Sequence, residues 1–314
     1  MREYYKKLDN ILRKNSAIRK VNISGEALFS LDGEILAATE SFTDNEKTFS
    51  FITSYMPTIC MLGAGHVAKA VFDTLSPLGF RFIIIDDRKE ILTENRFPSA
   101  SLICSSFSTL DYDFCKVTNP YFLVFTHAHL HDEEALSYVL KFKSHYYGMI
   151  GSERKIALTY SNMEKKGFSR ETLDSVHSPV GVKINAETPE EIAISIAAEI
   201  IATYRKNKKT VFISSDLIKK IIEIDEDAVL AEIVSKKGSA PRGAGSFMII
   251  TQSSFFFTIG GGSLENQVIS DARSILENRN DSMLKYYDME EKGGLDMACG
   301  GKEEIMFRLI RKDV

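Results

Sequence analysis

Short apolar runs alternate with amphipathic stretches through the middle of the chain. The runs at 57–63 (PTICMLG), 80–87 (FRFIIIDD) and 121–127 (YFLVFTH) are nearly all apolar, and a helical pattern follows at 132–142 (DEEALSYVLKF). Such nearly all-apolar strands are typical of a parallel sheet whose two faces are both covered by helices. The pattern predicts an α/β fold, a Rossmann-like doubly wound parallel sheet over residues 56–204.

The last helix of this domain carries the clearest local signal. In ETPEEIAISIAAEIIATY (187–204), Thr188 can cap the N-terminus, Pro189 suits the first turn, and Glu191 completes a capping box.

The flanking segments have other patterns. Residues 1–55 contain a predicted hairpin over 26–40 and are interpreted as an N-terminal extension. An abrupt change of composition makes 205–227 a linker candidate. Several strand patterns with one main helix over 263–278 then predict a smaller α+β domain at 228–314.

Composition and charge are those of an ordinary globular protein and do not favour a nucleic-acid-binding or membrane protein. The 314 residues are 44% apolar and 26% charged, which is ordinary for a globular chain, and the net charge of -4 gives no general attraction to nucleic acid or anionic membranes. The four cysteines form no CxxC pair, the N-terminus has no apolar signal region, and no apolar run reaches the roughly 18 residues of a membrane span. We expect a cytoplasmic protein with neither nucleic acid nor a membrane as partner.

A glycine-rich loop follows the first apolar strand and opens a helix. Gly63, Gly65 and His66 would let a pyrophosphate approach the helix N-terminus, and Asp86 or Asp87, at the end of the next strand, would hold ribose hydroxyls. The aspartates favour NAD or another adenine nucleotide over NADP, because they repel a 2′-phosphate. The alternative is that the glycines serve only the turn and the packing.

Histidines gather at the carboxyl end of the strand at 121–127. His127, His129 and Asp132 resemble a metal-binding pattern, which favours a metal-dependent hydrolase as one hypothesis. Two other interpretations of this segment remain, a polar loop without a ligand and a loop that binds an anionic ligand. In an NAD-dependent oxidoreductase, His127 or His177 would act as general acid or base.

A third loop offers groups that bind phosphate. Gly151, Ser152 and Lys155 supply backbone N–H groups, a hydroxyl and a cation, although a glycine turn before a solvated helix explains them equally well.

The C-terminal module has its own glycine loops. Arg242 stands in a glycine-rich loop and could grip a phosphate, while Gly260, Gly261 and Gly262 precede a helix that has Glu265 in its first turn.

Cys299 is flanked by two glycines and is therefore open to approach, whereas Cys60 and Cys104 lie in apolar strands and are expected to be inert. An accessible Cys299 could ligate a soft metal or carry sulfur, or it could simply fill a turn.

Together these motifs resemble the xanthine dehydrogenase accessory factor family, XdhC/CoxI. The resemblance covers about 56–204 and 228–312. It rests on GAGHVAKAV, IIDDR, THAHLHDEEAL, YYGMIGSERK, HSPVG, AETPEEIAISIAAEI, KGSAPRGAGSFMII, TIGGGSLENQVI and MACGGKEEIMF.

The resemblance implies a chaperone more than a turnover enzyme. Members bind the molybdenum cofactor (molybdopterin), receive sulfur from a cysteine desulfurase and deliver the cofactor to a molybdenum hydroxylase of the xanthine dehydrogenase type. A homodimer is also expected. The implied cofactor residues are Arg242, Gly260, Gly261, Gly262, Glu265 and Cys299, with Gly63, Gly65 and Asp86 as the nucleotide-like loop.

Two departures from the family pattern stand out. The Rossmann-like part precedes the smaller domain here, which reverses the usual order. Ser263 also occupies the place where CoxI-type relatives carry a cysteine, so a relay of two cysteines is in doubt.

Overall fold

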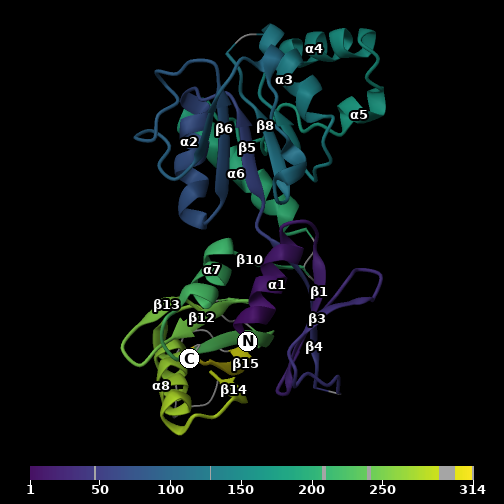
Figure 1. The fold of residues 1–314 in the computed structure, drawn as a ribbon. Coiled ribbons are helices and arrows are strands. Elements are labelled where there is room, and N and C mark those ends of the chain that lie inside the picture. Colours follow the sequence, from purple (N-terminus) through teal and green to yellow (C-terminus); the bar gives the residue numbers. More distant parts are fainter. Residues whose placement is uncertain (46, 128, 207–209, 239–241, 290–300, 313–314) are drawn as a thin grey trace. The chain divides into compact units, whose positions relative to one another are not determined.

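The computed structural model describes residues 1–45, 47–127, 129–206, 210–238, 242–289 and 301–312 (Figure 1). The chain divides into two units. Residues 56–208 form one of them, which we call the Rossmann unit. Residues 1–55 and 209–314 together form the other, which we call the split unit.

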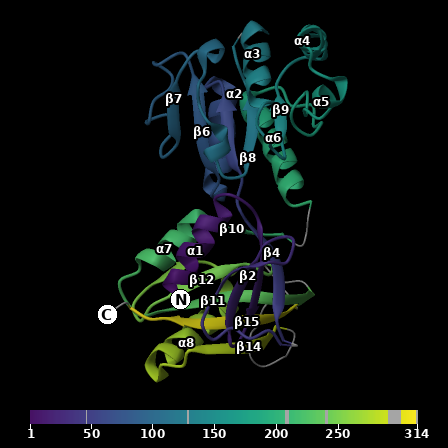
Figure 2. The ribbon, with the colours of Figure 1, turned by 45° about the vertical axis from the view of Figure 1, so that its right-hand side comes forward.

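The Rossmann unit is built on one parallel sheet with the strand order β7-β6-β5-β8-β9. Figure 2 shows β7 and β9 at its two edges. The strands are β5 (Thr58–Leu62), β6 (Arg81–Asp86), β7 (Ser101–Cys104), β8 (Pro120–Val124) and β9 (Tyr147–Met149). The helices are α2 (His66–Leu75), α3 (His129–Val139), α4 (Glu153–Lys165), α5 (Arg170–Asp174) and α6 (Pro189–Tyr204). Short 3-10 turns cover Ser76–Leu78, Phe107–Thr109 and Phe114–Lys116.

Helices cover both faces of this sheet, as the apolar strands predicted. All of β5 is buried. Its alternate side chains Cys60 and Leu62 pack with Leu136 of α3 and Met163 of α4, and α2 packs against α6. The predicted capping box of α6 is confirmed, because the Thr188 hydroxyl and the Glu191 carboxylate each accept a backbone N–H of the other residue.

The split unit contains two five-stranded sheets. The first has the order β10-β4-β1-β2-β3, antiparallel except for the parallel pair of β10 and β4, and the second has the antiparallel order β13-β12-β11-β15-β14. The first sheet comprises β1 (Ala17–Asn22), β2 (Gly25–Phe29), β3 (Ile35–Ala38), β4 (Phe49–Tyr55) and β10 (Thr210–Ile213). The second comprises β11 (Ala228–Gly238), β12 (Phe247–Ile250), β13 (Phe255–Phe257), β14 (Ser282–Asp288) and β15 (Gly301–Ile310). The helices are α1 (Arg2–Leu12), α7 (Ser215–Glu223) and α8 (Gly262–Asn278).

The domain boundaries expected outside the Rossmann unit need correction. Residues 1–55 are not an extension and 205–227 is not a linker, because α1, β10 and α7 bury their apolar faces in a core shared with β11. Leu8 of α1 and Leu217 of α7 both belong to that core. A helix with one apolar face must cover it, and here two segments far apart in the sequence cover each other.

A cluster of charges is sealed inside the split unit. Glu26 Oε2 accepts a hydrogen bond from Arg19 Nε (2.8 Å), and Oε1 accepts one from the Tyr5 hydroxyl (3.0 Å) and lies 2.9 Å from Arg308 Nε. Burial alone would raise the pKa of Glu26, but the two guanidinium groups outweigh it and hold the pKa below its usual value.

Across the described ranges, no helix combines the length and the apolar character needed to cross a membrane.

Candidate functional site

The residues singled out in the Rossmann unit lie at the carboxyl edge of its sheet. Gly63 and Gly65 follow β5, Asp86 ends β6, His127 follows β8, and Gly151 follows β9. Strand β5 has β6 on one side and β8 on the other, so the direction of the sheet's connections reverses at this point. Ligands of open α/β sheets bind in the crevice outside such a switch point.

The two glycines of the first loop are there for different reasons. Gly63 has φ +118, and a Cβ there would lie 2.2 Å from the carbonyl oxygen of Phe125, so the loop after β5 is pressed against the loop after β8. Gly65 has an ordinary φ of -66, and nothing among the described atoms comes within 4 Å of its Cβ position. The fold itself does not require glycine at 65, and the uncovered backbone there suits the close approach of a ligand. His66 is exposed in the first turn of α2.

The Asp86 carboxylate is occupied by hydrogen bonds from the glycine loop after β5 and from Arg88. The carboxylate is buried and accepts the Ala64 N–H (2.7 Å), the Arg88 N–H (3.0 Å) and two side-chain donors of Arg88 (2.9 and 2.8 Å). Burial would raise the pKa of Asp86, but these hydrogen bonds lower it below its usual value. The neighbouring Asp87 is exposed at this edge, and ribose binding by Asp86 stays a prediction.

Within the predicted histidine pattern, Asp132 is bound to other side chains of the protein. Asp132 is buried, accepts the Thr126 hydroxyl and pairs with the Lys155 ammonium group. Helix α3 begins at His129, and the His131 ring in its first turn lies beside His127, with the ring centroids 5.1 Å apart. Among the described side chains, which do not include His129, one ligand atom each of Asp87, His127 and His131 lie within 4.8 Å of one another.

The phosphate-binding groups predicted after β9 have partners within the chain. Ser152 caps α4 by accepting the Lys155 N–H (3.3 Å), and a Cβ on Gly151 would lie 3.1 Å from the Lys155 side chain. The charge of Lys155 is balanced by Asp132. A phosphate at this position would therefore have to compete with that carboxylate.

His177 lies beside β9, where it forms an isolated parallel bridge with Gly148. Its Nδ1 bonds to Glu199, which also accepts the Tyr146 hydroxyl (3.1 Å) and the Gly181 N–H. Burial would raise the pKa of Glu199, but these donors lower it. His177 thus belongs to a network that joins α6 to the turn at 177–181, and its catalytic role stays a prediction.

The glycine loop of the split unit is folded around Glu265. The carboxylate accepts the N–H groups of Ile259 (3.2 Å) and Gly261 (3.1 Å) and the hydroxyl of Thr258 (2.5 Å). Gly260 and its two successors have φ values of 133, 78 and 73, a run that favours glycine. Arg242 is exposed, and Cys299 lies outside the described residues.

The other cysteines differ from one another. Cys60 is fully buried and burial raises the pKa of its thiol, as expected of an inert residue. Cys104 was expected to be equally inert, but it is exposed at the end of β7, with its Sγ 3.8 Å from the Asp87 carbonyl oxygen.

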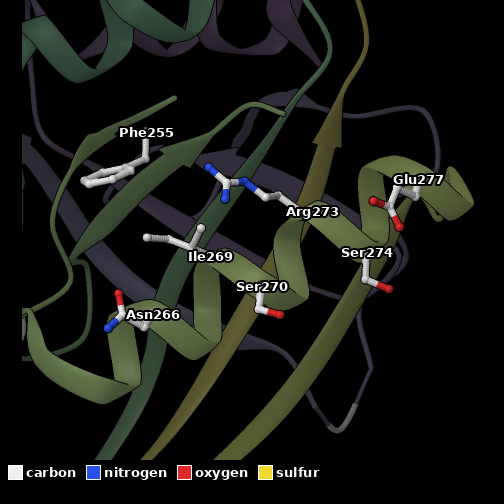
Figure 3. Close-up of a pocket in the computed structure, with 7 residues that line it drawn as sticks. All are labelled: Phe255, Asn266, Ile269, Ser270, Arg273, Ser274 and Glu277. Atoms are coloured by element: carbon white, nitrogen blue, oxygen red, sulfur yellow. The ribbon is translucent and has the colours of Figure 1, made fainter. Parts of the chain in front are cut away.

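A separate pocket of about 540 Å³ lies against α8 (Figure 3). Phe255 of β13 faces Ile269 and Arg273 of the helix across it. None of the residues singled out from the sequence lines this pocket.

Sequence reasoning missed His131 and Glu199. The available signal for His131 was its place in the same histidine-rich run as His127. No local signal marks Glu199 as the partner of His177.

Two sequence models match the chain. The XdhC Rossmann domain matches residues 59–200, and the XdhC and CoxI family matches residues 222–287. The chain belongs to the XdhC/CoxI family. Its Rossmann-like domain precedes the second family domain, as expected from the motifs.

Relatives agree with this assignment. The chain is 31% identical to the uncharacterized protein YqeB of Escherichia coli (strain K12) over 49% of this chain and 29% of that protein. It is 32% identical to a probable xanthine dehydrogenase subunit from Bacillus subtilis (strain 168) over 48% of this chain and 44% of the relative. The match thus spans less than half of either relative.

A similar fold has been solved. A crystal structure of a protein described as a xanthine dehydrogenase from Bacillus halodurans aligns with 65% of this chain and 66% of that one, with a TM-score of 0.51 and 23% identity.

Proposed function

We propose that this member of the XdhC/CoxI family is an accessory protein of a xanthine dehydrogenase-type molybdenum hydroxylase. It binds the molybdenum cofactor, takes part in its sulfuration with a cysteine desulfurase, and delivers it to the hydroxylase. The observation that carries the proposal is the presence of both family domains in one chain. The Bacillus subtilis relative, named as a probable part of a xanthine dehydrogenase, supports the same client class.

The residues assigned to the cofactor fit it in part. The cofactor carries a phosphate and a molybdenum dithiolene, and when bound it supplies the metal centre of the hydroxylase. Gly261 leaves room for such a ligand, because a Cβ there would meet nothing within 4 Å in the described structure. Glu265 already fills the N–H groups of Ile259 and Gly261, so we assign it to holding the loop. In this proposal Arg242 is the cation that binds the phosphate, and Cys299 is the thiolate that contacts the molybdenum centre.

The test is to identify what the protein carries. Chain expressed in a molybdate-supplied host is denatured, and released pterin is measured by fluorescence and molybdenum by mass spectrometry. We expect both, in equal amounts. Cys299→Ala should lower cofactor retention or the activation of an apo-hydroxylase, whereas Cys115→Ala, at an exposed cysteine of the Rossmann unit, should change neither. Absence of pterin from the wild type, or full activation by Cys299→Ala, contradicts the proposal.

One observation favours a second candidate, an NAD-dependent oxidoreductase. The uncovered backbone at Gly65 suits a dinucleotide, although Asp86 is held by Ala64 and Arg88. Saturable NADH binding that Gly65→Val abolishes, together with hydride transfer, would support this candidate. Cofactor release without NADH binding would support the accessory role.

We also expect the protein to act as a homodimer. Sedimentation velocity of the cofactor-loaded protein tests this, and a monomer over the working concentration range would contradict it.

A further inference from the structure

We propose that Asp87, His127 and His131 form a binding site for one divalent transition-metal ion, with zinc as the best-matched ion. The three side chains come from the end of β6, the end of β8 and the first turns of α3. One ligand atom of each lies within 4.8 Å of the other two. None of these three side chains is among the proposed cofactor residues.

The distances suit a shared ion. Zinc binds imidazole nitrogen and carboxylate oxygen at about 2.0–2.2 Å, so ligand atoms around it stand closer together than 4.8 Å. Asp87 and His127 are exposed and His131 is half-buried. Small rotations of the two exposed side chains would therefore close the three atoms onto one ion without disturbing the core.

His131 is held in the manner of a metal ligand. Its Nδ1 is 3.1 Å from Oε2 of Glu134, and the Phe107 ring lies beside it with the centroids 5.8 Å apart. A carboxylate that accepts a hydrogen bond from Nδ1–H fixes the tautomer with the lone pair on Nε2, and this pairing recurs behind metal-bound histidines. The contact with Glu134 is independent of the three-residue cluster itself.

The donor set selects the class of ion. Two imidazoles and one carboxylate favour first-row divalent metals over magnesium and calcium, which prefer oxygen ligands. Three protein ligands on an exposed sheet edge also leave a coordination position for water or a substrate, as in catalytic zinc sites. The buried Asp132 is excluded from the set, because Thr126 and Lys155 hold it.

Zinc titration of the purified full-length chain tests the site. Calorimetry with zinc chloride should show one ion per chain, and cobalt(II) should give the visible bands of a low-coordinate complex. His127→Ala and His131→Ala should abolish this stoichiometric binding, and Glu134→Gln should weaken it about tenfold to a hundredfold. His145→Ala is the matched control, since His145 is an exposed histidine of the same unit outside the cluster.

Asp87→Asn provides a second variant on an exposed surface residue, and circular dichroism checks the fold of each variant. Binding that survives both histidine substitutions, or no stoichiometric binding by the wild type, overturns the site. The titration needs no molybdenum, so its outcome is independent of the proposed function.

Discussion

Arg19 and Glu232 form a two-pronged ion pair inside the split unit, although 213 residues separate them in the chain. Both Nη atoms of the arginine lie 2.7 Å from a carboxylate oxygen, and both side chains are almost completely buried. The pair joins β1, from the start of the chain, to β11, which lies beyond the Rossmann unit.

Breaking this pair should destabilise the split unit. Arg19→Met leaves the Glu232 carboxylate buried without its partner and also removes the hydrogen bond from Arg19 to Glu26. Loss of one partner of a buried ion pair typically costs about 3–5 kcal/mol. Urea denaturation, with hydrogen exchange followed on β1 and β11 peptides, measures the loss. Arg311→Met is the control, because its pair with Asp281 (2.6 Å) is largely exposed and should contribute at most about 1 kcal/mol. Equal effects of the two substitutions would contradict a special role for the buried pair.

Glu303 should make the stability of the split unit depend on pH near neutrality. Its side chain is buried, neither oxygen has a hydrogen-bond partner among the residues that are described, and burial raises its pKa to about 7. A pKa above the unfolded value means that the folded state holds the proton more tightly. The resulting stability is complete below the unfolded pKa and is lost as the pH rises through about 7.

We therefore expect the unfolding free energy of the wild type to fall by about 2–3 kcal/mol between about pH 5 and pH 8, relative to Glu303→Gln. Glu304→Gln, on the opposite face of the same strand, should keep the wild-type pH dependence. Parallel pH profiles for the wild type and Glu303→Gln would refute this prediction.

Gly63 and Gly65 should respond differently to alanine. Gly63→Ala places a Cβ 2.2 Å from the Phe125 carbonyl oxygen at a positive φ, so we expect a loss of at least about 2 kcal/mol in the Rossmann unit. Gly65→Ala meets no neighbour and should leave stability within about 0.5 kcal/mol of the wild type. Thermal unfolding of both variants checks this, and a destabilised Gly65→Ala would mean that the loop is more tightly packed than described.

The role of His177 can be separated from that of its partner. Glu199→Ala removes the acceptor of Tyr146 and Gly181 as well as of His177, so it should destabilise the Rossmann unit by about 2–3 kcal/mol and by more than His177→Ala does. Chemical denaturation measures both. If His177→Ala abolished activation of a client hydroxylase with no change in stability, the histidine would have a catalytic rather than a structural part.

Local patterns were sufficient for the Rossmann unit because its elements follow one another in the chain. Each apolar run became a parallel strand, and the capping box at Thr188 and Glu191 marked the start of α6 correctly. The glycine loop and Asp86 also fell at the carboxyl edge of the sheet, where the order of strands and helices placed them.

The split unit was not predictable in the same way. Its core includes both Leu8 and Leu217 and is joined by the pairing of Arg19 with Glu232, and no local periodicity states which distant segment covers an apolar face. The part of His131 in the histidine site was not predicted. The start of α3 decides which way the His131 ring faces, and the ends of helices are assigned less exactly than their middles.

The interrupted path of the split unit has a consequence for synthesis on the ribosome. Residues 56–208 are contiguous and can fold as soon as they emerge, whereas β4 must wait for its sheet neighbour β10, which is translated after the Rossmann unit. Strand β15, which lies between β11 and β14, arrives last. The N-terminal hairpins are thus exposed to chaperones and proteases throughout the intervening translation, and a nascent chain stalled before β15 would carry a finished Rossmann unit beside an unfinished partner.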